Sequence, residues 1–207
     1  MDKIKAILFD FDGVLTMNAT GSASICNYVS AQAKIPLETF ESAYRECNDD
    51  LLYGKIKHSD IWEDLCRSLN SNIDIKLLYD SFINTPLDKT MLTYAERLKR
   101  QGYKIGMITD NKADRINTII KHFKLSPLFD TVCVSAIAGS GKDGVLIFEK
   151  ALNGLRLSAN ECVFIDNHEK NLIIPKQMGM EAIYFNHIKR DYKLFESQLE
   201  NFGVRSY

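Results

Sequence analysis

The chain has 207 residues, of which 45% are hydrophobic, and this is enough to bury one core or a core with a smaller added module. Its 26 lysine and arginine residues nearly balance its 27 aspartate and glutamate residues, which argues against nucleic acid or an anionic membrane as a partner and favours small solutes. The five cysteines have no Cys-x-x-Cys spacing and do not cluster with the four histidines, which argues against zinc and disulfides and favours a reducing, cytoplasmic compartment.

The first predicted element is a buried strand over residues 4–9, Ile-Lys-Ala-Ile-Leu-Phe. This apolar run is far shorter than the roughly 20 residues of a membrane span and lacks a small-residue cleavage site, so we expect neither an anchor nor a signal peptide. Asp10 and Asp12 follow the strand directly, and Gly13 comes next. Two carboxylates this close repel each other and lose solvation when buried, so the pair indicates a bound cation or a reaction.

Residues 16–87 predict an all-helical insertion. Pro36 can start a helix that ends at Gly54, and Ser59 or Asp60 can cap a second one; the apolar faces of the two helices comprise Leu37, Phe40, Tyr44, Cys47, Leu51, Ile61, Trp62, Leu65 and Leu69. Because the insertion leaves after the first strand and returns before the second, we expect its two connections at the sheet edge that carries Asp10. The expected domains are a core of residues 1–15 and 88–207 and a helical domain of residues 16–87.

Four more short apolar runs follow, at residues 103–109, 131–135, 162–166 and 181–185, and each predicts a strand. Helical periodicity separates them, around residues 92–98 before Gly102, 116–123 and 148–155. Strands that alternate with helices predict an α/β fold with a doubly wound, Rossmann-like parallel sheet.

Polar residues follow several of these strands, and ligands of doubly wound sheets bind beyond the carboxyl ends of the strands. The set comprises Asp10, Asp12, Thr109, Asp110, Lys142, Asp166 and Asn167. Each residue alone fits a turn, a helix cap or a solvated surface position, and Gly139 to Lys142 lack the spacing of a phosphate-binding P-loop. Their convergence on one edge of one sheet is what favours a functional site.

The residue types indicate phosphoryl chemistry. Asp10, Asp12 and Asp166 offer hard oxygen ligands, which suit Mg²⁺. A carboxylate beside the metal can attack phosphorus to form an aspartyl phosphate, and a second one can protonate the leaving alkoxide and later activate water. We predict that the Asp pair divides these two roles. Thr109, Asp110 and Lys142 are the candidate substrate-binding residues, because a hydroxyl and an ammonium can stabilise the oxygens of the phosphoryl group.

Four segments resemble the motifs of the haloacid dehalogenase superfamily. They are Asp10-Phe-Asp-Gly-Val-Leu-Thr16, Ile108-Thr109-Asp110, Lys142, and Phe164-Ile-Asp166-Asn-His-Glu-Lys-Asn171. The resemblance implies Asp10 as nucleophile, Asp12 as acid and base, Thr109 and Lys142 as phosphoryl binders, and Mg²⁺ held by Asp10, Asp166 and the main-chain carbonyl of Asp12. The helical insertion resembles the C1-type cap of the small phosphatase branch, on Tyr53-Gly-Lys-Ile and Asp60-Ile-Trp62.

Three departures from the family pattern bear on the site. Lys142-Asp-Gly-Val145 lacks the prolines that stiffen the third motif in many relatives. Asn167 stands where a second acid is common, and it adds no charge at the metal. Pro175 interrupts the segment 172–178, so we expect a kink or a late helix start there.

The resulting prediction is a Mg²⁺-dependent phosphatase for a small phosphorylated metabolite, such as a sugar or polyol phosphate. A phosphomutase stays open, whereas a dehalogenase would not need Asp12, a receiver-like module would not need the insertion, and a ligand-binding descendant would have lost an acid of the first motif. Tyr44, Asn48 and His58 are candidate substrate readers in the insertion, although a Tyr at helical spacing is more often a core residue and a lone His more often a surface one. The oligomeric state stays open.

Overall fold

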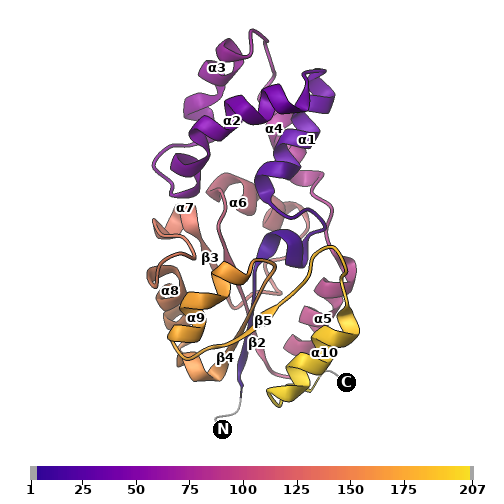
Figure 1. The fold of residues 1–207 in the computed structure, drawn as a ribbon, viewed down its shortest axis with the longest axis vertical. Helices are drawn as coiled ribbons and strands as arrows, with labels where there is room; N and C mark the ends of the chain where they lie inside the picture. The colour runs from indigo at the N-terminus through magenta and orange to yellow at the C-terminus, as the bar shows by residue number, and fades with distance from the viewer. Residues whose placement is uncertain (1–3, 206–207) are drawn as a thin grey trace.

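The structure of the chain, a computed structural model, describes residues 4–205. Its five strands are β1 (Ala6–Phe9), β2 (Lys104–Thr109), β3 (Thr131–Val134), β4 (Cys162–Asp166) and β5 (Glu181–Tyr184). They form one sheet in the order β3-β2-β1-β4-β5, and every neighbouring pair is parallel (Figure 1). The predicted doubly wound α/β fold is therefore confirmed, with strand bounds that differ from the expected ones by two residues at most.

Helices cover both faces of the sheet. One buried cluster joins the sheet to α5 (Lys89–Arg100), α6 (Ala113–His122) and α10 (Tyr192–Asn201), and a second joins it to α8 (Leu146–Leu155) and the segment around α9 (Ile173–Gln177). In β1, Ile7 and Phe9 belong to the first cluster, and Ala6 and Leu8 to the second. Because both faces of this strand are buried, its sequence reads as one continuous apolar run.

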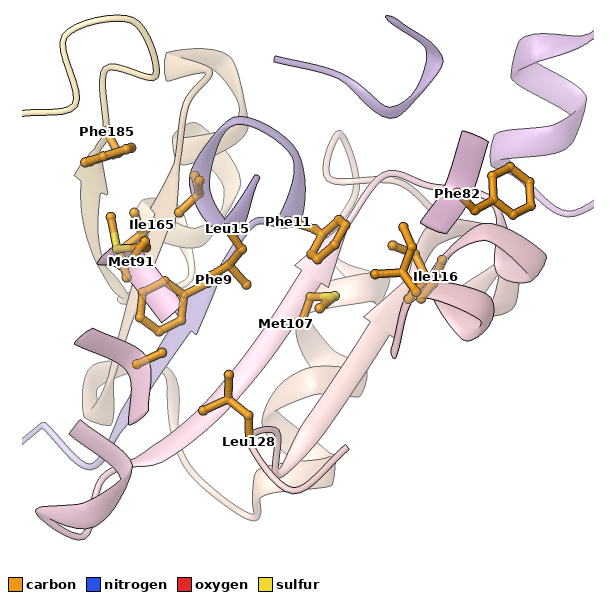
Figure 2. Packing of buried hydrophobic residues seen from close by; sticks show 14 of the residues in the cluster. Phe9, Phe11, Leu15, Phe82, Met91, Met107, Ile116, Leu128, Ile165 and Phe185 are labelled. Carbon is orange, nitrogen blue, oxygen red and sulfur yellow. The ribbon is translucent and has the colours of Figure 1, made fainter. Parts of the chain in front are cut away.

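The first cluster continues from the sheet into the inserted helices. Figure 2 shows Phe9 and Met107 on the strands, Phe11 just beyond β1, and Ile116 of α6 close to Phe82 of the insertion. All five side chains are completely buried. The insertion is therefore packed onto the core through apolar contact and not only through its two connections.

The insertion contains α1 (Gly21–Ala33), α2 (Leu37–Leu52), α3 (His58–Ser68) and α4 (Lys76–Ile83), which lie together beyond the carboxyl ends of the strands (Figure 1). Its two connections run side by side, because Thr16 and Leu87 form an antiparallel bridge and the Met17 N–H donates to the Pro86 carbonyl at 2.8 Å. This pairing supports a division into residues 1–15 with 88–207 and residues 16–87, which stays a prediction.

The helix boundaries confirm some expectations and correct one. Pro36 directly precedes α2 as its N-cap residue, as expected. The start of α3 was assigned wrongly to a cap at Ser59 or Asp60: α3 begins at His58, and Asp60 in its first turn accepts a hydrogen bond from the Lys57 N–H at 2.9 Å. Pro175 lies in the first turn of α9, which begins late, after the 3₁₀ turn Glu169–Leu172.

Three short elements remain, and the first is the turn Phe11–Leu15 after β1. The helix α7 (Ser135–Ala138) directly follows β3, and a 3₁₀ turn (Ala159–Glu161) precedes β4. Within residues 4–205, no helix combines the length and the apolar character that crossing a membrane would require.

Candidate active site

The turn that follows β1 carries the aspartate pair. The Phe11 N–H donates to Asp10 Oδ1 at 2.7 Å, which orients this carboxylate at the end of the strand. Gly13 has φ +79°, a left-handed conformation that favours glycine, and a Cβ there would lie 2.3 Å from Asn167 Nδ2. Glycine therefore allows the turn to fold back against the end of β4, and Asp10 and Asp12 are both 5% exposed.

The ammonium of Lys142 lies between two carboxylates. Its Nζ is 2.9 Å from Asp10 Oδ1 and 2.6 Å from Asp166 Oδ2, and the side chain is buried. Burial lowers the pKa of Lys142, but the carboxylates of Asp10 and Asp166 outweigh it and raise the pKa above the usual lysine value. Lys142 is thus a charged group inside the site. The loop holds it without prolines, because the Lys142 N–H donates to Asp110 Oδ1 at 2.9 Å.

Asp166 ends β4 and is completely buried. Its Oδ1 accepts a hydrogen bond from the His168 N–H at 2.7 Å, and Asn171 Nδ2 lies 3.1 Å from each carboxylate oxygen. With the contact from Lys142, these donors fix the orientation of the carboxylate toward the end of β1.

The carboxylate of Asp12 faces a side chain that sequence analysis missed. Arg115 of α6 is completely buried and donates from Nη1 to Asp12 Oδ2 at 2.8 Å and from Nη2 to Asp12 Oδ1 at 2.9 Å. Asn111 Nδ2 donates to Asp12 Oδ2 at 2.6 Å, and Thr16 Oγ1 donates to Asp12 Oδ1 at 3.3 Å. No local signal in the sequence identifies these partners, because Asn111 and Arg115 lie about a hundred positions from Asp12 and only the fold brings them together.

Asp10, Asp12, Thr109, Asp110 and Lys142 all line one cavity of about 420 Å³. Thr109 is buried at the end of β2, and its Oγ1 accepts from Asn111 Nδ2 at 3.3 Å. The insertion contributes Ser22, Asn48 and Leu52 to the cavity wall. A cavity of this size, with charged groups on one side, suits a small and strongly polar ligand.

Of the three candidate readers in the insertion, only Asn48 lines this cavity. Tyr44 is a buried core residue. The expectation that His58 is a surface residue is wrong: it is 1% exposed, its Nε2 is 2.7 Å from Tyr44 Oη, and its Nδ1 is 2.7 Å from Asp114 Oδ2. Since Asp114 belongs to α6, His58 links the insertion to the core.

Oxygen donors suited to a hard cation meet at the end of β1. The amide group of Asn167 has one terminal atom 3.3 Å from Asp10 Oδ2 and 3.1 Å from the main-chain oxygen of Asp12. Turned one way, the amide nitrogen donates to both oxygens; turned the other way, the amide oxygen completes an all-oxygen set, which is the donor type that Mg²⁺ prefers. Burial raises the pKa of Asp10 well above its usual value despite Lys142, and a cation at this position would oppose that shift.

The oxygen atoms that could bind a cation do not all come from side chains. Within residues 4–205, no three side chains of His, Cys, Asp or Glu converge on a common metal position. The carboxylate of Asp12 is turned to Arg115, so its main-chain oxygen, and not its side chain, lies beside Asp10. The residues therefore fit a cation through one main-chain and several side-chain oxygens.

The sequence of this chain matches a known protein family and is similar to several phosphatases. The family described as haloacid dehalogenase-like hydrolase matches residues 7–185. The glyceraldehyde 3-phosphate phosphatase of Methanocaldococcus jannaschii is 27% identical over 93% of this chain and 89% of its own length. A sesquiterpene phosphatase of Aspergillus oryzae is 27% identical over 87% of this chain and 89% of its own length.

Solved structures share the architecture. A haloacid dehalogenase family enzyme of Bacteroides thetaiotaomicron, crystallised with magnesium and inorganic phosphate, superposes with a TM-score of 0.72 at 18% sequence identity. The alignment covers 93% of this chain and 99% of that one. The core and the inserted helices together therefore have a known counterpart in fold.

Proposed function

The chain belongs to the haloacid dehalogenase-like hydrolase family, and we propose that it is a Mg²⁺-dependent phosphatase that hydrolyses a small phosphomonoester through an aspartyl phosphate. One observation carries this proposal: Asp10 directly follows β1 in a cavity with Lys142 at 2.9 Å, while Asp12 in the same cavity is held separately by Arg115. Two neighbouring carboxylates with different partners are suited to two different roles.

In the first step, a carboxylate oxygen of Asp10 attacks phosphorus, the new oxygen–phosphorus bond forms, and the bond to the leaving alkoxide breaks. Thr109 and Lys142 bind the non-bridging oxygens of the phosphoryl group, with Asp110 holding the Lys142 main chain at 2.9 Å. The Lys142 ammonium is buried and bonded to Asp166, so it needs little reorganisation to meet negative charge on the phosphoryl group.

Asp12 moves the proton in both steps. It protonates the leaving oxygen as the alcohol departs, and it then takes a proton from the water that attacks the aspartyl phosphate, which releases phosphate and restores Asp10. Its bonds to Arg115 and Asn111 fix its position in the cavity. Arg115 is thus a positioning residue in this mechanism.

We assign the cation site to Asp10, Asp166, Asn167 and the main-chain carbonyl of Asp12. Bound Mg²⁺ would supply charge neutralisation between the nucleophile and the phosphoryl group. The oxygen donors around Asn167 and the raised pKa of Asp10 support this assignment. Asn167 would contribute an uncharged oxygen where a second acid is common.

The substrate class we propose is a small sugar or polyol phosphate, with residues 16–87 as the cap over the site. The cavity volume of about 420 Å³ supports a compact substrate. The two curated relatives act, by name, on glyceraldehyde 3-phosphate and on a sesquiterpene phosphate. The leaving groups of these two substrates differ widely, so similarity to these relatives does not favour one particular leaving group.

The test is phosphate release from a panel of small phosphomonoesters, with Mg²⁺ and with a chelator. Parent protein is compared with Asp10→Asn and with Asp64→Asn, a matched change on the exposed face of α3. The proposal expects metal-dependent release in the parent and in Asp64→Asn and none in Asp10→Asn. Acid-quenched parent should carry one phosphoryl group on the peptide that contains Asp10. A folded, Mg²⁺-loaded parent that releases no phosphate from any ester would reject the proposal.

A further inference from the structure

One buried cation on the wall of the cavity, Lys112, has no role in the proposed phosphoryl transfer. Within residues 4–205, three lysine or arginine residues are buried as whole residues, namely Lys112, Arg115 and Lys142. Arg115 is paired with Asp12, and Lys142 with Asp10 and Asp166. Among the described residues, no carboxylate oxygen lies within 4.0 Å of Lys112 Nζ, so Lys112 alone of the three lacks an anionic partner.

The partners of Lys112 are neutral and come from the insertion. Its Nζ donates to Ser22 Oγ at 2.7 Å and to Asn48 Oδ1 at 2.8 Å, and Ser22 Oγ itself donates to Asn48 Oδ1 at 2.8 Å. The ring of Tyr44 lies 5.5 Å from the ammonium. Lys112, Ser22 and Asn48 all line the cavity that contains Asp10. We call these three residues the Lys112 cluster.

Burying a cation without a counter-charge is unfavourable, so such a group is retained where a ligand supplies the charge. Burial, together with the neighbouring Arg115, lowers the pKa of Lys112 to about 7. The surrounding charges include Asp12 and Asp114, which oppose this shift without contacting the ammonium. A bound anion would favour the protonated form, so ligand charge and lysine charge reinforce each other.

We propose that the Lys112 cluster binds an anionic group on the leaving alcohol, so that the preferred substrates are small phosphomonoesters carrying a carboxylate or a second phosphate. This inference rests on the proposed phosphatase function and names its substrate class. In the proposed mechanism the phosphoryl group is bound by Thr109 and Lys142, and the Lys112 cluster adds a separate set of side chains to the wall of the same cavity. A second anion therefore has its own cationic partner and does not compete for Lys142.

The alternative is that Lys112 only fastens the insertion to the core. The two roles differ in one variant, Asn48→Asp, which keeps the size of the side chain and gives Lys112 a carboxylate partner. A fastening role predicts that Asn48→Asp changes the activity toward all esters by the same factor, so that the ratios between esters stay as in the parent. An anion-binding role predicts that the new carboxylate occupies the ammonium and repels the second anion of the substrate.

The experiment compares three esters with one three-carbon skeleton: 3-phosphoglycerate, glycerol 1,3-bisphosphate and glycerol 3-phosphate. 3-Phosphoglycerate and glycerol 1,3-bisphosphate each carry a second anionic group, which glycerol 3-phosphate lacks. For each of these two esters, the ratio of its kcat/KM to that of glycerol 3-phosphate is measured in the parent, Lys112→Met and Asn48→Asp. We expect a parent ratio of at least about tenfold for one of the two anionic esters, and its loss in both variants. Preference for 3-phosphoglycerate identifies a carboxylate site, and preference for the bisphosphate identifies a second phosphate site. A ratio that is near one in the parent, or unchanged in Asn48→Asp, overturns the inference.

Binding separates failure of this inference from failure of the proposed function. Calorimetry with Asp10→Asn and Mg²⁺ gives Kd for the same esters without turnover. Asp10→Asn/Asn48→Asp serves as the matched variant. An anion preference in Kd that Asn48→Asp removes supports the inference even where the parent releases no phosphate. Equal Kd values in an active parent overturn the inference alone, and no binding of any ester together with no turnover overturns both.

Discussion

Arg115 binds both carboxylate oxygens of Asp12, at 2.8 Å and 2.9 Å, although the two residues are 103 positions apart in the chain. The pair joins the turn after β1 to the first part of α6, and Asp12 lines the cavity. Both side chains are buried, so their charges are screened little by solvent. This pairing holds the proposed acid and base of the reaction in one orientation.

Replacing Arg115 should damage both stability and turnover. Arg115→Met leaves the buried carboxylate of Asp12 without its main partner, which should lower the free energy of unfolding by about 3–5 kcal/mol. In the fraction that stays folded, kcat should fall at least about tenfold, because a misplaced acid and base transfers protons less efficiently. Urea unfolding and phosphate release measured on the same preparation separate the two effects.

The matched control is Arg115→Lys, which keeps the positive charge but cannot form the two parallel hydrogen bonds. It should retain more stability than Arg115→Met and still show a reduced kcat. A Met variant with parental kcat would contradict the positioning role of Arg115.

Removing the carboxylate of Asp12 should affect esters according to their leaving groups. Asp12→Asn keeps the shape of the side chain but cannot transfer a proton, so kcat for an alkyl phosphate should fall by about 10²–10⁴. The first step with p-nitrophenyl phosphate needs no proton on the leaving oxygen, so burst release of p-nitrophenol should survive better than steady turnover. Rapid-quench kinetics with both esters measures this difference. Near-parental steady turnover of the alkyl phosphate would rule out the acid and base assignment.

Lys112→Met should stabilise the protein at neutral pH. The pKa of Lys112 falls from 10.5 to about 7 on folding, so between these values the unfolded chain binds more protons and parental stability rises with pH. The destabilisation of the folded state by the buried ammonium is therefore complete below about pH 7 and disappears above about pH 10.5. Ser22 Oγ and Asn48 Oδ1 are hydrogen-bonded to each other at 2.8 Å in the parent, so we expect both to stay paired when Lys112 is replaced.

The expected gain in free energy of unfolding is about 1–3 kcal/mol at pH 6, shrinking toward zero near pH 10. Urea unfolding of parent and variant at both pH values gives the difference. A gain that coincides with loss of the anion preference is the pattern of a residue retained for binding at the expense of stability. A Met variant that is less stable than the parent at pH 6 would show that the hydrogen bonds of Lys112 outweigh its burial.

The sequence predicted the sheet and its acids well because both depend on local patterns. Short apolar runs that end in Asp10 or Asp166 mark buried strands with polar carboxyl ends, and each strand needs only its own residues to be recognised. The helix α1 escaped prediction because its segment Gly-Ser-Ala-Ser-Ile-Cys-Asn has little apolar periodicity, so packing against α2 and α4, and not its own pattern, explains it.

The partners of the acids could not be predicted in the same way. Arg115 and Lys112 look like ordinary surface cations beside the apolar positions of α6, and only the approach of the β1 turn and the insertion buries them. Burial of a charge depends on residues about a hundred positions away, which no local pattern contains. Lys142 illustrates the opposite case, since the resemblance did place it in the site, and its loop, which lacks the prolines of many relatives, is held by a hydrogen bond from the Lys142 N–H to Asp110.

Gly21→Ala gives the most selective test of the Arg115 and Asp12 pair, because it removes no polar group. Gly21 is the first residue of α1, and alanine in place of glycine reduces the backbone entropy lost on folding, which by itself favours the helix. In this chain an added Cβ would lie 2.5 Å from Arg115 Nη1 and 2.9 Å from Asp12 Oδ2, so the pair must shift. We therefore expect Gly21→Ala to lower both the free energy of unfolding and kcat. The cost depends on Arg115, so it should shrink when Gly21→Ala is introduced into Arg115→Met, and a double-mutant cycle measures this coupling. Additive effects in the cycle would mean that the methyl group acts elsewhere, and a stabilised, fully active Gly21→Ala would mean that helix propensity outweighs the contact.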